Sequence, residues 1–294
     1  MSQLQRIVIA PAQLQQQQIA LTSQQQHYLM RVLRLRQGDR FIAMDGKGQW
    51  WLAVLAETTA QILEQMQVQT ELAVEITLMV ALPKGNGFDE VVRACTELGV
   101  NCFAPVTSDR TLLHPSPQKL ERWRRIAAEA AEQSERQIVP TILDPVPFNK
   151  GLLSVTGDRK YICVARGNAP HLLKSLQPIP PSPPSKGGLQ DSLPASLGEF
   201  DSSSPPLQDN SNFPSPREFD SSSALLQGGL GGSIVIATGA EGGWTTNEVE
   251  NAIAAGFQPV SLGKRILRAV TAPIVAISQI SAIVEISINS ENPE

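Results

Sequence analysis

The chain has 294 residues, of which 41% are hydrophobic and 18% charged, and its formal net charge is -4. This length predicts one or two domains with a sizeable core, in a composition typical of soluble globular proteins. Cys95, Cys102 and Cys163 lack the number and spacing of a disulfide framework or a zinc site, so we expect a reduced, cytoplasmic protein without a metal. No signal peptide is visible, and the longest apolar stretch (272–286) is too short and too polar to span a membrane.

One long segment, 177–232, differs in composition from the rest of the chain. It holds ten of the 22 prolines and twelve serines, and Glu199–Ser204 recurs as Glu218–Ser223. Such a polar, proline-rich segment cannot bury enough apolar surface to order itself, so we predict a disordered insertion within one domain. Without its two basic and six acidic residues, the remainder has 22 of each sign. A nucleic-acid contact would therefore be a local patch rather than a basic protein surface.

Residues 1–72 predict a first, small barrel-like unit. The pattern indicates a strand at 7–9 and a helix that begins with a capping box at Ser23–Gln26. Leu29, Val32 and Leu33 would form one face of this helix. Two strands, at 40–45 and 50–56, flank the hairpin sequence Asp45–Gly48.

Five basic side chains lie within fourteen residues of this first unit: His27, Arg31, Arg34, Arg36 and Arg40. They are typical either of a solvated helix face and loop or of a patch that contacts phosphates. The cluster by itself does not choose between these two interpretations.

Residues 73–294 predict an α/β unit in which strands and helices alternate. The apolar run at 74–82 is typical of a strand covered on both faces, and the run at 88–98 has helical spacing. A strand at 102–106, a long helix beginning at Ser116 and a strand at 160–165 follow. This alternation predicts a mostly parallel sheet with helices on both sides.

The most informative stretch is Ile234–Arg268. An apolar strand at 234–237 ends in the glycine-rich turn Gly239–Gly243, which carries one carboxylate, Glu241. Thr245 and Glu248 form a capping box for the next helix, which is expected to end at Gly256. A second strand at 260–262 ends in another glycine. Because ligands bind at the carboxyl ends of strands in α/β sheets, we expect the site here.

This stretch resembles the signature of a known family. The pattern consists of Gly239-x-Glu241-Gly242-Gly243-Trp244, then Glu248, then Gly256-Phe257, then Ser261-Leu262-Gly263-x-Arg265-Ile266-Leu267-Arg268-x-x-Thr271-Ala272. It is similar to the RsmE family of 16S rRNA (uracil-N3)-methyltransferases, which belong to the SPOUT class. Upstream, Leu82-Pro83-Lys84, Glu97-Leu98-Gly99 and Gln133-Ser134-x-Arg136 agree with the same family. Ala240, Val270 and Ala94 depart from it, since the family usually has proline, glutamate and lysine there.

The resemblance implies a trefoil-knotted methyltransferase domain preceded by a small PUA-like β-barrel, in a homodimer that acts on 16S rRNA or the small ribosomal subunit. It also implies S-adenosyl-L-methionine as cofactor, held by the residues of the two glycine-containing turns. These residues are Thr238, Gly239, Glu241, Gly242, Gly243, Leu262, Gly263, Ile266, Leu267 and Arg268. The implied RNA contacts are His27, Arg31, Arg34, Arg36, Arg110 and Arg136.

For the chemistry, Arg268 is a candidate to stabilise negative charge on the uracil ring, and Glu241 is a candidate orienter or proton acceptor. Each residue has a structural alternative: Arg268 could hold a phosphate, and Glu241 could only bond backbone amides. Two other functions stay open. One is the same fold acting on a ribose 2′-hydroxyl or a tRNA base, and the other is a non-catalytic ribosome-assembly factor.

Overall fold

The structure is a computed structural model of the chain, and it describes residues 4–113, 115–176 and 232–291. The predicted insertion at 177–232 lies outside the described residues, except for Gly232, which begins a strand. The boundary proposed at residue 72 falls in the connection between the last strand of the first unit and the first strand of the second.

The first unit is a curved six-stranded sheet with short helical segments, in the manner of a PUA-like half-barrel. The sheet order is β1-β4-β5-β6-β3-β2, and β1 pairs parallel with β4 while the other pairs are antiparallel. The predicted hairpin is confirmed, since Asp45 Oδ1 accepts hydrogen bonds from the amides of Lys47 and Gln49 at 2.7 and 3.0 Å. The elements are β1 (Arg6–Val8), η1 (Pro11–Gln13), β2 (Leu14–Gln15), β3 (Gln18–Ala20), α1 (Ser23–His27), η2 (Tyr28–Val32), β4 (Arg40–Met44), β5 (Trp50–Leu55) and β6 (Thr59–Met66).

The predicted start and face of the first helix need correction. The cap is Thr22, one residue earlier than predicted, and its hydroxyl accepts from the Gln25 amide at 3.2 Å. After α1 the helix widens to the π-turn η2, so each turn takes in an extra residue. The wider turn moves Val32 off the buried face: Leu29 is buried, whereas Val32 is 56% exposed.

The second unit is the predicted α/β domain. Its strands pair in the order β10-β8-β7-β12-β11-β13, with β9 beside β8, and every pair among the described residues is parallel. The elements are β7 (Val74–Ala81), α2 (Gly87–Glu97), β8 (Cys102–Thr107), α3 (Pro117–Gln133), β9 (Thr141–Ile142), β10 (Val146–Pro147), α4 (Phe148–Ser154), β11 (Arg159–Cys163), α5 (Leu172–Leu176), β12 (Gly232–Thr238), α6 (Thr246–Ala254), β13 (Gln258–Val260) and α7 (Thr271–Glu291).

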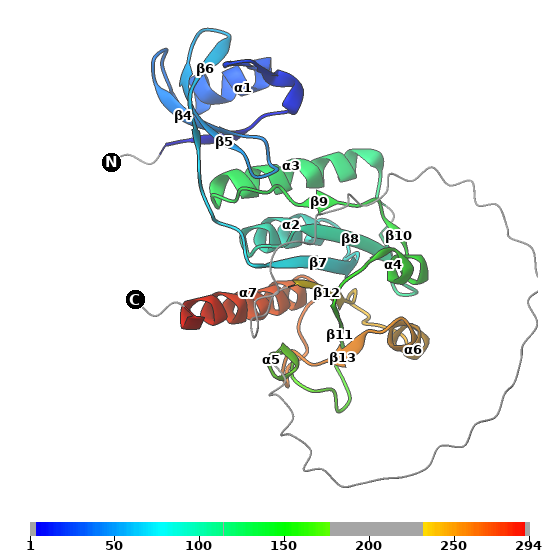
Figure 1. Ribbon diagram of the computed structural model, residues 1–294. Helices are drawn as coiled ribbons and strands as arrows, with labels where there is room; N and C mark the ends of the chain where they lie inside the picture. The colour runs from blue at the N-terminus through cyan, green and yellow to red at the C-terminus, as the bar shows by residue number, and fades with distance from the viewer. Residues whose placement is uncertain (1–3, 114, 177–231, 292–294) are drawn as a thin grey trace, which may run out of the picture. The chain divides into compact units, whose positions relative to one another are not determined.

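Helices cover both faces of this sheet, as the doubly buried strand at 74–82 predicted. Alternate residues of β7 enter two separate cores: Ile76 and Leu78 pack with α2, α3, α5 and α7, and Met79 packs with α4 and α6. Figure 1 shows α7 on one side of the strands and α4 with α6 on the other. The chain enters the sheet at β7, builds outward through β8, and returns to the other side at β11. The loops after β7 and β12 therefore meet where the strand order reverses, which is where α/β sheets bind ligands.

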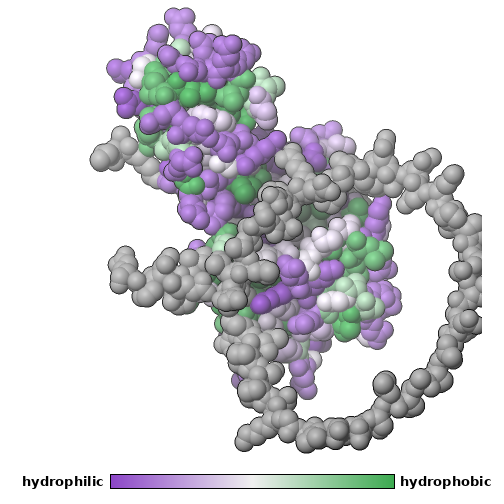
Figure 2. Space-filling model, viewed as in Figure 1, coloured by the Kyte–Doolittle hydropathy of each residue, from purple (hydrophilic) through white to green (hydrophobic). Residues whose placement is uncertain are grey.

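In the view of Figure 2, a hydrophobic band crosses the first unit and hydrophilic residues border it. None of the described helices has both the length and the apolar character needed to cross a membrane.

Strand β1 contacts helix α3 of the second unit. The Val8 amide donates to Glu132 Oε1 at 2.5 Å, and Arg6 forms an ion pair of 2.8 Å with Glu135. Burial raises the pKa of the Glu132 carboxyl to about 7, the bond from Val8 opposes this rise, and the Glu129 carboxylate adds to it. The folded chain therefore holds a proton on Glu132 at pH values where the unfolded chain has released it.

This shift predicts a pH dependence of stability that depends on one side chain. The contribution of Glu132 is complete below its ordinary pKa of 4.5 and is lost as the pH rises through about 7. Glu132→Gln keeps an oxygen for the Val8 amide and cannot ionise. We expect it to be more stable than wild type by about 2 kcal/mol at pH 8 and nearly equal at pH 4.5. Urea unfolding at the two pH values measures this, with Glu250→Gln on the exposed face of α6 as control. If the stability difference between Glu132→Gln and wild type is the same at both pH values, the prediction is wrong.

Candidate active site

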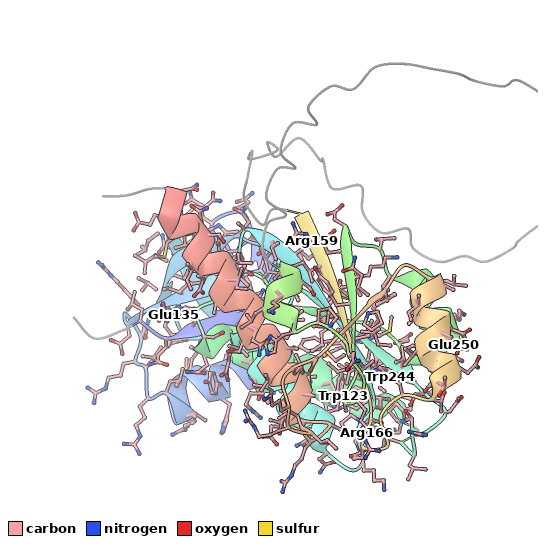
Figure 3. The ribbon with its side chains drawn as sticks, turned by 90° about the horizontal axis from the view of Figure 1, so that it is seen from below. Trp123, Glu135, Arg159, Arg166, Trp244 and Glu250 are labelled. Carbon is pink, nitrogen blue, oxygen red and sulfur yellow. The ribbon has the colours of Figure 1, made fainter. Side chains whose placement is uncertain are left out.

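The predicted site is a cleft of about 880 Å³ at the carboxyl ends of β11, β12 and β13. Three loops form its walls: the segment after β11 (164–170), the glycine-rich turn after β12 (239–245) and the segment after β13 that leads into α7. Figure 3 shows Arg166 of the first loop and Trp244 of the second near the same end of the strands. The parallel arrangement brings these loops together, because parallel strands direct their carboxyl ends to one edge of the sheet.

Two glycines of the glycine-rich turn leave little room for a side chain. A Cβ on Gly239 would lie 3.2 Å from the Cα of Gly243, and one on Gly242 would lie 2.8 Å from Cδ of Arg110. The Gly243 amide donates to the Ala240 carbonyl at 2.8 Å, which closes the turn. The turn therefore exposes bare backbone to the cleft, as a flat ligand needs for close approach.

Helix α6 begins at the predicted capping box. The Thr245 hydroxyl accepts from the Glu248 amide at 3.2 Å, and Glu248 Oε2 accepts from the Thr245 amide at 2.7 Å. Glu248 is buried, and its Oε1 also accepts from the Asp109 amide at 2.9 Å. The ring of Trp244 packs on Phe148 with centroids 4.6 Å apart. These contacts fix the turn to the loop after β8 and to α4.

Arg110 has a role that sequence reasoning missed. Its Nη1 donates to the Gly242 carbonyl and, at 3.4 Å, to the Trp244 carbonyl. Arg110 lines the cleft, so the position predicted to contact RNA also supports the glycine-rich turn. Its side chain is exposed and can still face a ligand in the cleft.

Glu241 extends from the turn to the loop after β7. Its Oε1 accepts from the Lys84 amide at 2.9 Å. The two loops at the reversal of strand order are thus joined by a side chain that also lines the cleft. Glu241 therefore bonds a backbone amide, as in the structural alternative to its chemical role. This amide belongs to Lys84 in the loop after β7 rather than to the glycine-rich turn.

The other predicted residues divide into those that line the cleft and those that do not. Ile266 and Leu267 line it. The Thr238 side chain is fully buried at the end of β12, and Leu262 packs against the core, so neither side chain faces the cleft as predicted. Gly263, with φ +119, lines an adjacent hollow of about 400 Å³. Arg268 is exposed and lies one residue past Leu267, outside the cleft wall.

Sequence reasoning also missed the loop after β11, which supplies a complete wall of the cleft. It contains Arg166, Gly167 (φ +106) and Asn168, and it ends at Pro170, whose carbonyl accepts from the Ser261 amide at 2.8 Å. A glycine- and proline-containing loop directly after a predicted strand was the available signal. The strand predicted at 260–262 lies two residues earlier, at Gln258–Val260, and Ser261 instead forms an isolated bridge with His171.

Comparison with known proteins identifies the chain. The family model of the RNA methyltransferase domain matches residues 70–182 and 209–281, and that of the RNA methyltransferase PUA domain matches residues 21–63. A ribosomal RNA small subunit methyltransferase E from Synechocystis sp. is 45% identical over 95% of this chain and 78% of its own length. This chain belongs to the ribosomal RNA small subunit methyltransferase E family. It is a methyltransferase, as the motifs predicted.

Other members of the family agree in extent and fold. The Bacillus subtilis (strain 168) protein of the same name is 27% identical, and the match covers 89% of each chain. A crystal structure of the Neisseria gonorrhoeae family member, bound to S-adenosyl methionine, superposes with a TM-score of 0.69 at 26% identity. That match covers 95% of this chain and 98% of the other.

The departures from the family pattern fit the local packing. Val270, at the position of the usual glutamate, is half-buried against the core. It packs closely on Gly87, where an added Cβ would lie 2.9 Å from Cγ2 of Val270. Ala240, at the position of the usual proline, is buried on the opposite face of the sheet. Both side chains are apolar and pack against apolar neighbours. The only charged side chain of the glycine-rich turn is therefore Glu241.

Four of the predicted RNA contacts of the first unit are exposed: His27, Arg31, Arg34 and Arg36. All four belong to α1, η2 and the loop that follows. No arrangement of three or more His, Cys, Asp or Glu side chains among the described residues could hold a metal ion.

Arg136 is a correction, because it is buried and only 4% exposed. Its Nη2 pairs with Glu71 Oε2 at 2.5 Å, and its Nη1 donates to the carbonyls of Thr96 and Val100 at 3.0 and 2.6 Å. Its donors are used inside the protein, so this side chain does not contact RNA. The sequence match at this position reflects structure rather than binding.

Removing this arginine should therefore destabilise the domain. Arg136→Ala leaves Glu71 and two carbonyls without their partner, and we expect a loss of about 3 kcal/mol in the free energy of unfolding. Arg124→Ala is the control, because Arg124 pairs with Glu121 and Asp144 on the surface. Its loss should stay below about 1 kcal/mol. Equal effects of the two substitutions in chemical denaturation would contradict the structural role.

Proposed function

We propose that this methyltransferase uses S-adenosyl-L-methionine to methylate N3 of a uridine in the 16S rRNA of the small ribosomal subunit. The observation that carries the proposal is the cleft at the ends of β11, β12 and β13, built from bare glycine backbone and apolar side chains. The names of the relatives from Synechocystis and Bacillus subtilis, and the bound molecule in the Neisseria gonorrhoeae structure, support the substrate and the cofactor.

The residues of the cleft fit this cofactor. Gly239, Gly242 and Gly243 let backbone groups approach a flat adenine and a ribose, while Ile266 and Leu267 supply apolar contact. The volume of about 880 Å³ has room for a nucleoside beside a second base. The indole N–H of Trp244 is buried without a partner in the described residues and is a donor available at this edge. Arg166 and Asn168 close the opposite wall.

S-adenosyl-L-methionine supplies an electrophilic methyl group with its own leaving group, so no metal is required. The protein must hold the uracil ring and stabilise the negative charge that develops when N3 loses its proton. We assign the stabilisation of the ring oxygens to the guanidinium of Arg268. Glu241 has one oxygen bonded to the Lys84 amide, and we assign it the role of orienting the turn and accepting the proton with the other oxygen.

The N3 atom lies on the Watson–Crick edge, so the target uridine has to be unpaired or flipped out of its helix. His27, Arg31, Arg34 and Arg36 would hold the RNA backbone on the first unit, and Arg110 would continue this contact at the cleft. These contacts position the RNA, while the cleft selects the base.

We extend the proposal to a cytoplasmic homodimer with a knotted chain at the cleft. The Ser261 amide donates to the Pro170 carbonyl at 2.8 Å, and the Leu172 amide donates to the Ser261 carbonyl at 2.9 Å. These bonds hold the segments after β11 and β13 side by side, which supports the proposed knot. The exposed Ile286 of α7 supports a further contact surface. Light scattering on the purified protein should give twice the chain mass, and a monomer would contradict this part.

Calorimetry with S-adenosyl-L-methionine tests the cofactor, and transfer of a labelled methyl group to 16S rRNA or small subunits tests the reaction. We expect saturable binding and N3-methyluridine as the product. Binding without transfer would favour a non-catalytic assembly factor, and a 2′-O-methyl product would place the same fold on another target. The absence of binding would overturn the proposal.

A further inference from the structure

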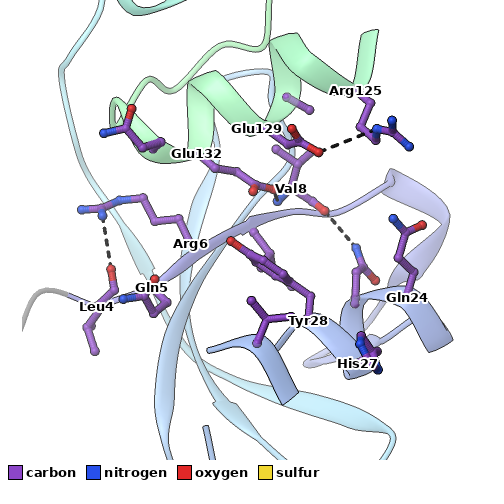
Figure 4. A pocket seen from close by; sticks show the side chains of 15 residues that line it. Leu4, Gln5, Arg6, Val8, Gln24, His27, Tyr28, Arg125, Glu129 and Glu132 are labelled. Atoms are coloured by element: carbon purple, nitrogen blue, oxygen red, sulfur yellow. Dashed lines mark hydrogen bonds and ion pairs between the residues drawn. The ribbon is translucent and has the colours of Figure 1, made fainter. Parts of the chain in front are cut away.

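A second cleft, of about 850 Å³, lies apart from the methyl-transfer site, between β1, the α1–η2 segment and α3. Figure 4 shows Tyr28 and His27 on one side of it and Glu129 and Glu132 on the other, with β1 between them. Of the residues that line it, the function proposed above uses only His27, as a contact to the RNA backbone.

One side of the cleft is an exposed aromatic ring. Tyr28 is 39% exposed, and Val32, four residues on in the same π-turn, is 56% exposed. Burial raises the pKa of the Tyr28 phenol, and the carboxylates of Glu132 and Glu129 raise it further, which places both acidic side chains within electrostatic reach of the ring. The side wall of the cleft is thus a flat, partly apolar surface bordered by hydrogen-bond acceptors.

The opposite side carries these acceptors on α3. Glu132 uses Oε1 for the Val8 amide, and Glu129 pairs with Arg125 at 3.7 Å on the rim. The Val8 carbonyl accepts from Gln25 Nε2 at 2.9 Å. Both outward backbone groups of Val8 are therefore occupied, so another polypeptide strand cannot pair with β1 at this point. The cleft suits a flat ring with donors rather than an added strand.

The surroundings favour nucleic acid. His27 and Arg125 line the cleft, Arg31 lies three residues beyond Tyr28 on the same segment but outside the lining, and all three are exposed. Cations around an aromatic ring are the arrangement that holds a phosphate backbone while a base stacks. A carboxylate accepts best from adjacent ring and amino N–H groups, which guanine presents at N1 and N2.

We propose that this cleft binds one unpaired guanine of the RNA substrate, stacked on Tyr28 with its Watson–Crick donors toward the Glu129 side chain. This inference rests on the proposed RNA substrate and adds a second point of recognition, remote from the methylated base. It would fix the register of the RNA, since the enzyme would hold two unpaired bases at once.

The test compares Tyr28→Ala with Tyr28→Phe in the full-length protein, using filter binding to 16S rRNA or small subunits. We expect Tyr28→Ala to raise the Kd about 10-fold and Tyr28→Phe to stay within about 2-fold of wild type, because the stacking ring is retained. Leu63→Ala, which removes another exposed hydrophobic side chain of the first unit, on strand β6, is the matched control. Ultraviolet cross-linking should join a guanosine to the peptide that contains Tyr28, and replacing that guanosine with inosine should weaken binding.

The outcomes separate this inference from the proposed function. Affinity of each variant for S-adenosyl-L-methionine reports whether its methyltransferase domain is intact and should equal that of wild type. If the wild type transfers methyl groups but Tyr28→Ala binds RNA as tightly as wild type, the guanine site is wrong and the proposed function stands. A cross-link to another base, or to no base at this peptide, also overturns the guanine site. If the wild type does not bind S-adenosyl-L-methionine, the proposed function fails.

Discussion

Replacing Gly239 with valine should raise the Kd for S-adenosyl-L-methionine about 10- to 100-fold. The new side chain would have to occupy space held by the backbone of Gly243, since even a Cβ would lie 3.2 Å from its Cα and 3.3 Å from its carbonyl carbon. Backbone cannot rotate away as a side chain can, so the turn must open. An overpacked site of this kind costs about 1–3 kcal/mol, and here the distortion falls on the cofactor surface.

A matched glycine controls for general destabilisation. A Cβ on Gly157 would lie 2.7 Å from Cγ2 of Val235, away from the cleft. Gly157→Val should therefore lower the melting temperature about as much as Gly239→Val, while its affinity for the cofactor stays near that of wild type. Calorimetry and thermal melts on both variants separate the two effects. Equal losses of cofactor affinity would show that the glycine-rich turn has no special role.

Replacing Arg268 with alanine should lower kcat by about 10²–10³-fold and leave the affinity for S-adenosyl-L-methionine within about 2-fold of wild type. The reason is that Arg268 is exposed beside the cleft and does not line it, so its charge is available to the uracil rather than to the cofactor. Loss of a charged donor aimed at developing negative charge has this magnitude in other enzymes. Single-turnover methyl transfer at saturating RNA measures the step directly.

Arg268→Lys should recover part of the rate, because a charge remains although the planar fork is lost. Lys264→Ala, which removes another exposed cation of the same segment, should leave kcat unchanged. A rise in KM for RNA with an unchanged kcat would instead assign Arg268 to a phosphate, which is the structural alternative to its chemical role.

The sequence predicted this fold well where local signals and global packing agree. The apolar runs predicted the strands β7, β8, β11 and β12, and Gly256 predicted the end of α6. In each case the local sequence pattern and the packing of the parallel sheet favour the same structure. The capping box at Thr245 was correct for the same reason, since both partners lie within four residues. The first helix was shifted by one residue, because Thr22 and Ser23 are both good caps and only the tertiary structure chooses.

The errors concern side chains whose partners are distant in the sequence. Arg136 belongs to the family motif Gln133-Ser134-x-Arg136, and nothing local shows that it is buried and paired with Glu71, 65 residues earlier. The bond from Glu241 to the Lys84 amide and those from Arg110 to the glycine-rich turn join residues more than 130 positions apart. The loop at 164–170 was missed because its place in the cleft depends on the order of strands in the sheet, not on a motif.

The most direct test of the proposed function is mass mapping of 16S rRNA from cells that contain or lack this protein. We predict that one N3-methyluridine disappears in its absence. It should return with the intact chain and be strongly reduced with Gly239→Val, whose affinity for the cofactor is expected to fall about 10- to 100-fold. An rRNA methylation pattern that is the same with and without the protein would contradict the proposed function.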